Sequence, residues 1–206
     1  MIHKIWSNDK RFKRVEFSVG LNVILAERTL ESGQKDTRNG AGKTTLLNVM
    51  HFCLGADLHR LSLPKNELED WVFYISLDLC GETFTAKRSI SNAKIIEIMG
   101  DVSKLALPPE VDSKGTTFYK NDDWKNLLGK CLFKIRGESS TKYVPSFRSL
   151  VSYFTRKGAD AYTDPFKHFR NQKTYDLQIH NAYLLGLNWV LASEAQEIRD
   201  KESAIK

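Results

Sequence analysis

The feature that most constrains this chain is a glycine-rich turn that runs directly into an apolar segment. The turn and its continuation are Asn39-Gly40-Ala41-Gly42-Lys43-Thr44-Thr45-Leu46. Glycine has no Cβ, so Gly40 and Gly42 allow left-handed backbone angles that aim successive N–H groups at one concave point. A helix beginning near Lys43 would add the positive end of its dipole and its unpaired first-turn N–H groups. Together these features predict a phosphate-binding loop.

The spacing follows the nucleotide-binding pattern G-x-x-x-x-G-K-[ST], except that Thr37 stands at its first position. In that pattern the lysine contacts the β and γ phosphates and the hydroxyl binds Mg²⁺. We therefore predict that Lys43 is catalytic and that Thr44 is a metal ligand. The predicted nucleotide-binding residues are Arg38, Asn39, Gly40, Ala41, Gly42, Lys43, Thr44 and Thr45. The alternative is a glycine-rich loop that only caps an ordinary helix.

The segments around the turn supply the context that the motif requires, which is a strand, a loop and a helix. The run Leu21-Asn22-Val23-Ile24-Leu25 predicts a buried strand before the loop. Apolar residues after the loop predict a helix with one apolar face: Leu46, Leu47, Met50, Phe52 and Leu54. This context favours the functional interpretation of the turn.

Three β-branched and aromatic runs follow, at residues 71–79, 82–89 and 94–99, joined by short turns. They predict an antiparallel meander. In the middle run Phe84, Ala86 and Arg88 alternate with polar residues, which predicts a sheet with one solvated face.

Residues 20–24, 39–47 and 52–55 resemble the N-terminal half of an SMC/RecF/RecN-type ATPase head, the branch of ABC ATPases that acts on DNA. The resemblance covers about residues 1–100. It implies an α/β fold, namely the N-terminal lobe of a P-loop head of ABC/SMC type, with a mixed and antiparallel sheet, a P-loop helix and the start of a coiled-coil arm. It also implies ATP and Mg²⁺ as cofactors. The polar stretch 26–38 is similar to an insertion in SMC-like ATPases of Lamassu-type bacterial anti-phage and anti-plasmid systems.

We expect two parts, the lobe at residues 1–180 and the root of the coiled-coil arm at residues 181–206. In the second part Leu184, Leu191, Ile198 and Ile205 are spaced by seven, with charged residues between them. The alternative for this segment is an ordinary surface helix.

The net charge of +6 and the isoelectric point near 9.1 fit a polyanionic partner such as DNA. Four cations lie within five residues at a predicted hairpin turn, where they could neutralise phosphates or simply be solvated. Arg60 lies at the distance past the P-loop lysine at which the resembled heads carry an arginine. The predicted DNA contacts are Lys10, Arg11, Lys13, Arg14, Arg60, Lys87 and Arg88.

In the resembled heads a glutamine contacts Mg²⁺ and the attacking water, and here Gln172 and Gln178 are the candidates. We assign this catalytic and metal-binding role to Gln172. The Ser-Gly-Gly signature and the strand ending in Asp-Glu that such heads need are absent from the sequence. We therefore expect ATP binding with negligible hydrolysis by this chain alone. The expected partners are the C-terminal half of the same head, a second head in a homodimer, DNA, and accessory or nuclease subunits.

Two other functions stay open at this point. One is a nucleotide-independent DNA-binding or assembly module with a vestigial P-loop. The other is a small P-loop kinase or GTPase, which the predicted antiparallel meander disfavours. No run of 18 apolar residues occurs, so we expect a cytoplasmic protein with no membrane partner. Three cysteines without C-x-x-C spacing argue against a zinc site and a disulfide framework, and predict small buried thiols.

Overall fold

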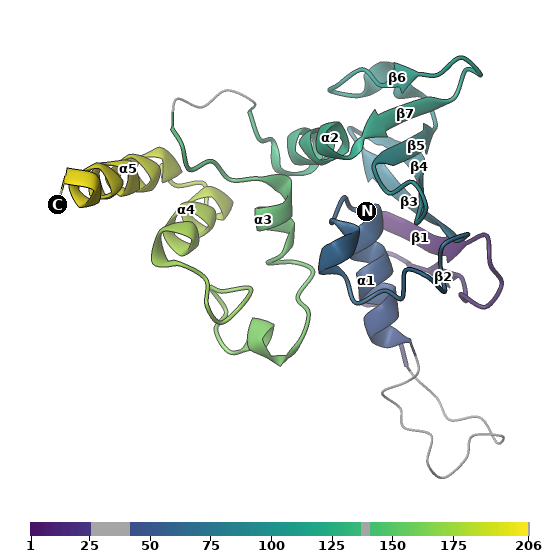
Figure 1. Cartoon of the computed structure of the whole chain (residues 1–206), viewed down its shortest axis with the longest axis horizontal. Coiled ribbons are helices and arrows are strands. Elements are labelled where there is room, and N and C mark those ends of the chain that lie inside the picture. The colour runs from purple at the N-terminus through teal and green to yellow at the C-terminus, as the bar shows by residue number, and fades with distance from the viewer. Residues whose placement is uncertain (26–41, 137–140, 206) are drawn as a thin grey trace, which may run out of the picture. The chain divides into compact units, whose positions relative to one another are not determined.

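The computed structural model describes residues 1–25, 42–136 and 141–205 (Figure 1). The chain divides into two compact units, Met1–Trp124 and Lys125–Lys206, with the boundary inside helix α2. The elements in order are β1 (Ile2–Ser7), β2 (Val15–Glu16), α1 (Lys43–Cys53), the 3-10 helix η2 (Leu58–Arg60), β3 (Val72–Leu79), β4 (Glu82–Ser89), β5 (Ile95–Met99), η3 (Val102–Lys104), β6 (Glu110–Val111), β7 (Thr117–Lys120), α2 (Asn121–Phe133), α3 (Phe147–Val151), η4 (Ala159–Tyr162), α4 (Thr174–Leu184) and α5 (Trp189–Ile205).

The first unit is built on a seven-stranded sheet of order β2-β1-β3-β4-β5-β7-β6. Every strand pair in the described residues is antiparallel, and the predicted meander of β3, β4 and β5 is confirmed. The parallel part of the predicted mixed sheet is not seen in this part of the chain. The antiparallel pairing also counts against the kinase or GTPase alternative, because that fold needs parallel strands with crossover helices.

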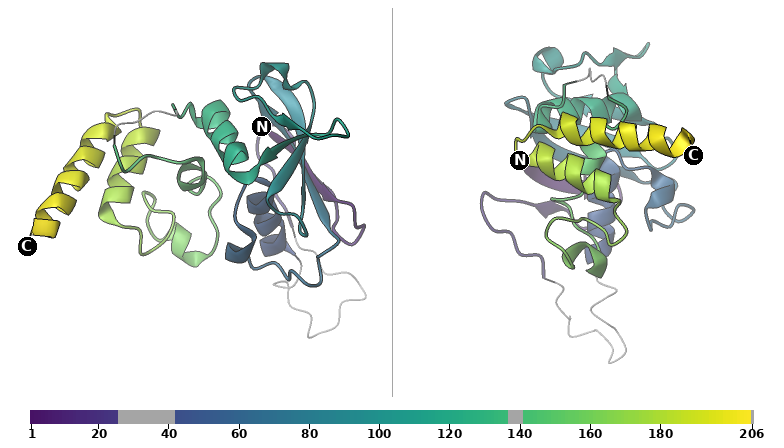
Figure 2. Two further views of the ribbon diagram at one scale, coloured as in Figure 1. Left: turned by 45° about the horizontal axis from the view of Figure 1, so that its top comes forward. Right: turned by 90° about the vertical axis from the view of Figure 1, so that its left-hand side faces the viewer.

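One face of this sheet is apolar, as the alternation in β4 predicts. Phe73, Ile75 and Phe84 are at most 1% exposed. Helix α1 lies against this face (Figure 2). Phe52 of α1 meets Phe73 of β3 edge to face at 6.1 Å between ring centroids. The predicted helix after the glycine-rich turn is therefore present, and its apolar side forms the core with the sheet.

The other face of the sheet is polar and its charges are matched. Trp6 of β1 and Tyr74 of β3 stack there with their rings 5.1 Å apart. Three lysines of this face each lie beside a glutamate on a neighbouring strand: Lys4 with Glu16 at 3.9 Å, Lys87 with Glu97 at 2.7 Å and Lys120 with Glu110 at 2.8 Å.

The prediction of a buried strand at residues 21–25 is wrong. These residues pair with no described strand, and Leu21 and Leu25 are 90% and 72% exposed. An apolar strand is buried only when sheet neighbours cover it, and the described residues supply none beside it. Instead the Asn22 side chain folds back, accepting from the Ser18 N–H at 2.9 Å and donating to the Ser18 carbonyl at 2.8 Å.

The second unit is helical. Phe147 and Leu150 of α3 and Ile179 of α4 are at most 2% exposed. The Tyr183 hydroxyl of α4 donates to the Phe133 carbonyl at the end of α2, at 2.9 Å. Helix α3 begins with a capping box at Ser146 and is only five residues long.

The seven-residue apolar spacing does not lie on one helix. Helix α4 ends at Leu184, and Gly186 takes a left-handed φ of 71°, so the chain turns before α5 begins at Trp189. Leu191, Ile198 and Ile205 are 62%, 57% and 86% exposed along α5. The coiled-coil arm stays a prediction.

The cysteines differ from one another. Cys53 is a buried free thiol whose pKa is raised to about 12 by burial. Cys80 is exposed at the β3–β4 turn, and Cys131 is half-buried on α2. The expectation of three buried thiols therefore holds for Cys53 alone. In the described ranges, no helix is long and apolar enough to cross a membrane.

Candidate functional site

The N-terminus of α1 has the form of an anion site. Helix α1 begins at Lys43, and its N-cap is Gly42, whose φ of 80° and ψ of 3° lie in the left-handed region. Gly42 has no side chain that could cap the first-turn N–H groups, and no acidic residue lies in that turn. Lys43, Thr44 and Thr45 are exposed. The amides of this first turn, the positive end of the helix dipole and the Lys43 ammonium group all favour a bound phosphate at this point.

A pocket of about 690 Å³ opens beside this helix end. Its cationic lining comes from Arg11, Lys13 and Lys43. The rest of its lining is largely apolar and aromatic: Phe12, Val15, Ile24, Leu25, Gly42, Thr45, Leu46, Pro64, Leu68, Trp71 and Phe73. An apolar cavity with a few cations at one side suits a ligand that has an aromatic group and an anionic group.

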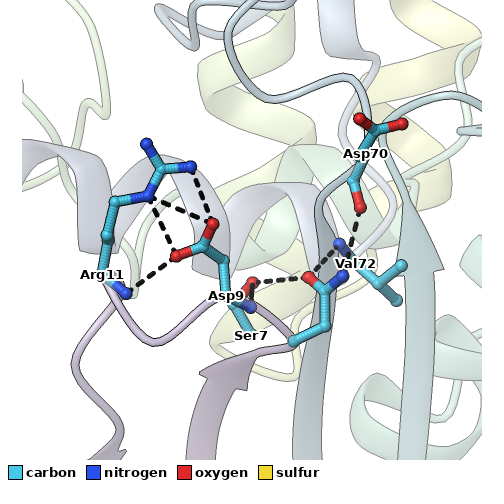
Figure 3. Close-up of polar contacts among 6 residues, drawn as sticks. Ser7, Asp9, Arg11, Asp70 and Val72 are labelled. Atoms are coloured by element: carbon cyan, nitrogen blue, oxygen red, sulfur yellow. Dashed lines mark hydrogen bonds and ion pairs between the residues drawn. The ribbon is translucent and has the colours of Figure 1, made fainter.

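The turn after β1 is fixed against the start of β3 (Figure 3). Arg11 of this turn and Trp71, directly before β3, both line the pocket. Asn8 accepts from the Val72 N–H at 2.8 Å and donates to the Asp70 carbonyl at 3.1 Å. Arg11 donates to the Asp9 carboxylate at 2.7 Å, and its guanidinium lies 5.0 Å from the centroid of the Trp71 ring. The Arg11 side chain holds the pKa of the Asp9 carboxyl below its usual value.

Much of the predicted loop lies outside the described residues. Arg38, Asn39, Gly40 and Ala41 belong to this part, as does the stretch 26–38 that resembles the Lamassu-type insertion. Their phosphate-binding role stays a prediction. Of the predicted nucleotide site, the structure describes Gly42, Lys43, Thr44 and Thr45, which are consecutive at the start of α1.

The residues present at the start of α1 fit a nucleotide with Mg²⁺. The Thr44 hydroxyl is exposed in the first turn, where a metal ion beside a bound triphosphate would need a ligand. No group of three or more His, Cys, Asp or Glu residues within the described ranges could hold a metal ion.

The predicted DNA contacts differ in whether an acidic side chain of the same chain lies beside them. Lys10 and Lys13 are exposed on the turn after β1. The others on the surface each have an acidic neighbour: Arg11 with Asp9 at 2.7 Å, Arg14 with Glu16 at 3.1 Å, Arg60 with Asp57 at 3.6 Å and Lys87 with Glu97 at 2.7 Å. Exposed pairs of this kind are weak, so they lower the local field without preventing a phosphate contact.

The prediction that Arg88 contacts DNA is wrong. Its side chain is 2% exposed, and its guanidinium lies 4.3 Å from the centroid of the Phe52 ring. It donates to the carbonyls of Phe52 and Ala56 at the end of α1 and to the Ala93 carbonyl after β4. A buried guanidinium needs several acceptors, and these carbonyls provide them. Arg88 therefore ties α1 to the sheet and is not available to DNA.

Gln172 is 7% exposed and belongs to the second unit. Its side-chain amide donates to the Tyr153 hydroxyl at 2.6 Å, and its carbonyl accepts from the His168 N–H at 3.2 Å. These contacts give it a structural role inside its own unit. Its predicted role at Mg²⁺ stays untested, and Gln178 is exposed on α4.

The pocket walls were not predicted. Phe12 lies inside the basic run whose cations are predicted DNA contacts, and Trp71 stands at the start of a predicted strand. The two residues come from segments far apart in the chain, and Phe12 and Trp71 are each within 5.8 Å of Phe73, measured between ring centroids. No local sequence pattern predicts that these two segments lie beside each other.

Comparison with known proteins gives one family. The family described as AAA domain matches residues 2–205, nearly the whole chain. No curated protein and no solved structure matches this chain.

Proposed function

Because the chain belongs to the AAA domain family, whose members are ATPases that generally use ATP and Mg²⁺, we propose that it binds ATP at the N-terminus of α1. The observation that carries this proposal is the acid-free first turn of α1, which follows a left-handed glycine with no capping side chain. The triphosphate would meet the amides of this turn and the Lys43 ammonium, and Thr44 would bind Mg²⁺. The adjacent pocket, with Phe12 and Trp71 in its walls, would take the base and ribose.

We further propose that the chain is the N-terminal lobe of an SMC-like ATPase head of the SMC/RecF/RecN type. Phosphoryl transfer depends on groups positioned around the γ-phosphate. The signature and Asp-Glu segments that supply such groups in these heads are absent from the sequence. Hydrolysis would then need the C-terminal half of the head and pairing with a second head.

Two exposed apolar surfaces support partners of this kind. Val19, Leu21 and Val23, which follow β2, are 90%, 90% and 67% exposed. Leu191 and Ile198 are exposed along α5. Apolar surfaces of this type usually mark interaction sites. A sheet from the C-terminal half would cover the first surface, and a coiled-coil arm would use the second.

The proposed biological role is DNA sensing or processing, in genome maintenance or in anti-phage and anti-plasmid defence of the Lamassu type. Support comes from the net charge of +6 and from the exposed lysines Lys10 and Lys13. Accessory or nuclease subunits would complete such a system.

The test of the proposed ATP site is a binding titration with a fluorescent ATP analogue. The Lys43→Ala variant should lose binding by at least about tenfold, because the ammonium no longer meets the phosphates. Lys114→Ala, which removes the same charge from the exposed β6–β7 turn, is the matched control and should bind like the parent. Equal affinity of the Lys43→Ala variant would contradict the proposal. The parent chain should bind ATP with negligible turnover, and ordinary ATPase rates would refute the need for a second half.

A further inference from the structure

Residues 153–173 of the second unit form a surface loop rich in aromatic and basic side chains, which we name the aromatic loop. Four of its aromatic side chains are largely exposed: Phe154 at 68%, Tyr162 at 68%, Phe166 at 59% and Phe169 at 43%. So many exposed rings in so short a stretch are costly in water, and such surfaces usually bind something. The proposed ATP site uses none of them.

The aromatic loop is closed at its base. The Gln172 side-chain amide donates to the Tyr153 hydroxyl at 2.6 Å, which joins the two ends of the loop. The Gln172 carbonyl accepts from the His168 N–H. The buried glutamine thus holds the ends of the loop together.

The centre of the aromatic loop is filled by the Arg156 guanidinium. It donates to the Tyr153 carbonyl at 3.1 Å, to the Ala161 carbonyl at 2.9 Å and to the Pro165 carbonyl. Asn181 of α4 adds a bond to the Phe166 carbonyl at 3.0 Å. These bonds supply donors to four backbone carbonyls of the loop. Because the loop is held in this way, its exposed rings would lose little conformational freedom on meeting a ligand.

The charge of the aromatic loop favours an anionic ligand. The cations between residues 153 and 173 are Arg156, Lys157, Lys167, Arg170 and Lys173, against the two aspartates Asp160 and Asp164, a net charge of +3. Arg170 and Asp160 form a 3.0 Å ion pair that is mostly solvent-exposed. Such a pair is weak and can reorganise around a phosphate.

We propose that the aromatic loop binds single-stranded nucleic acid. Unpaired bases would stack on the rings of Phe154, Tyr162, Phe166 and Phe169, and Lys167, Arg170 and Lys173 would meet the phosphates. Stacking on protein aromatics requires bases that are not already stacked in a duplex, so single strands should bind better than duplexes. This proposal narrows the DNA association proposed above to one surface and one kind of strand, and it does not depend on ATP binding.

The test uses fluorescence anisotropy of the whole chain with a labelled oligothymidylate of roughly 20 nucleotides, longer than the site of one small binding fold. Phe166→Ala and Tyr162→Ala should each weaken binding by about 5- to 100-fold. Both side chains are exposed, so their removal should not unfold the loop. Phe166→Trp keeps a stacking surface and should retain the affinity, with quenching of tryptophan fluorescence by the bound strand.

The matched controls separate this surface from others. Val111→Ala removes a side chain that is 63% exposed in the first unit and should leave the affinity unchanged. Lys43→Ala, which tests the ATP site, should also bind the oligonucleotide normally. Arg170→Gln should reduce the slope of log affinity against log salt by about 0.7, the value for one phosphate contact on a single strand.

Three results would overturn the proposal. The first is an unchanged affinity in both Phe166→Ala and Tyr162→Ala. The second is a duplex of the same length binding as tightly as the single strand. The third is equal competition by polyglutamate or by vesicles of anionic phospholipid, which would show a general polyanion or membrane surface.

Discussion

The buried Arg88 offers the sharpest test of how α1 is fixed to the sheet. Its guanidinium donates to three backbone carbonyls, those of Phe52, Ala56 and Ala93, and lies against the Phe52 ring. In the Arg88→Ala variant these carbonyls lose their charged donor in a region that water reaches poorly, since the arginine is 2% exposed.

The expected loss of stability follows from these contacts. A buried acceptor left without its donor costs about 1–3 kcal/mol. The arginine stem and the contact with Phe52 add packing that alanine cannot replace. Because some carbonyls can relax or take up water, we expect a total loss of about 3–4 kcal/mol rather than the full sum. Arg88→Lys keeps the charge but cannot reach carbonyls on both sides, so it should lose about half as much.

The assay is urea unfolding, followed by circular dichroism together with hydrogen exchange of the β4 amides, which report on the first unit. With a slope of about 2 kcal/mol per molar urea, the midpoint should fall by about 1.5–2 M in Arg88→Ala. Lys87→Ala is the neighbouring control. It breaks only the partly exposed pair with Glu97 and should cost at most about 1 kcal/mol. A loss below about 1 kcal/mol in Arg88→Ala would refute the structural role of Arg88 and favour an exposed position for its side chain.

Two further predictions concern pH and the glycine before α1. The pKa of His168 is lowered from 6.5 to about 4, mainly by burial and further by His180 and Arg156. As pH falls, His168 is protonated in the unfolded chain before it is protonated in the folded chain. The free energy of unfolding should therefore fall by up to ~3 kcal/mol as pH drops from about 6.5 to about 4. His168→Phe should flatten this slope in urea titrations at pH 7 and pH 5, and an identical slope in both proteins would contradict the assignment. Gly42→Ala places a side chain at φ 80° and should cost about 1–2 kcal/mol by backbone strain, with weaker ATP binding. Gly115→Ala, at φ 79°, has equally open space around its Cβ and should cost as much stability in thermal unfolding while leaving ATP binding intact; loss of ATP binding in both variants would speak against a specific role of Gly42.

The parts of the fold that the sequence predicts are those encoded by local pattern. The alternation in β4 places Phe84 and Ala86 on the buried face, and the apolar spacing after Lys43 gives α1. The same alternation placed Arg88 on the buried face. The prediction of Arg88 as a DNA contact is wrong because a charged side chain is buried only where acceptors meet it, and the packing of α1 on β4 supplies those carbonyls.

The features that the sequence does not predict depend on segments that are far apart. The apolar run at residues 21–25 looks like a buried strand by composition, but its burial requires neighbouring strands that the described residues do not contain. The pocket beside α1 requires the turn at Phe12 to meet the loop before Trp71, which is fixed by the contacts of Asn8 with Asp70 and Val72. The seven-residue spacing after Leu184 fails as a single helix because Gly186 supplies a left-handed turn.

The matched lysines and glutamates on the polar face of the sheet have a consequence for where nucleic acid could approach. Lys4, Lys87 and Lys120 each have a glutamate within 3.9 Å, so the electrostatic potentials of the two charges nearly cancel a short distance out into solvent. A polyanion arriving at this face would release few counterions, and its attraction to the face would hardly vary with salt. The long-range attraction implied by the net charge of +6 must therefore originate on other surfaces of the molecule.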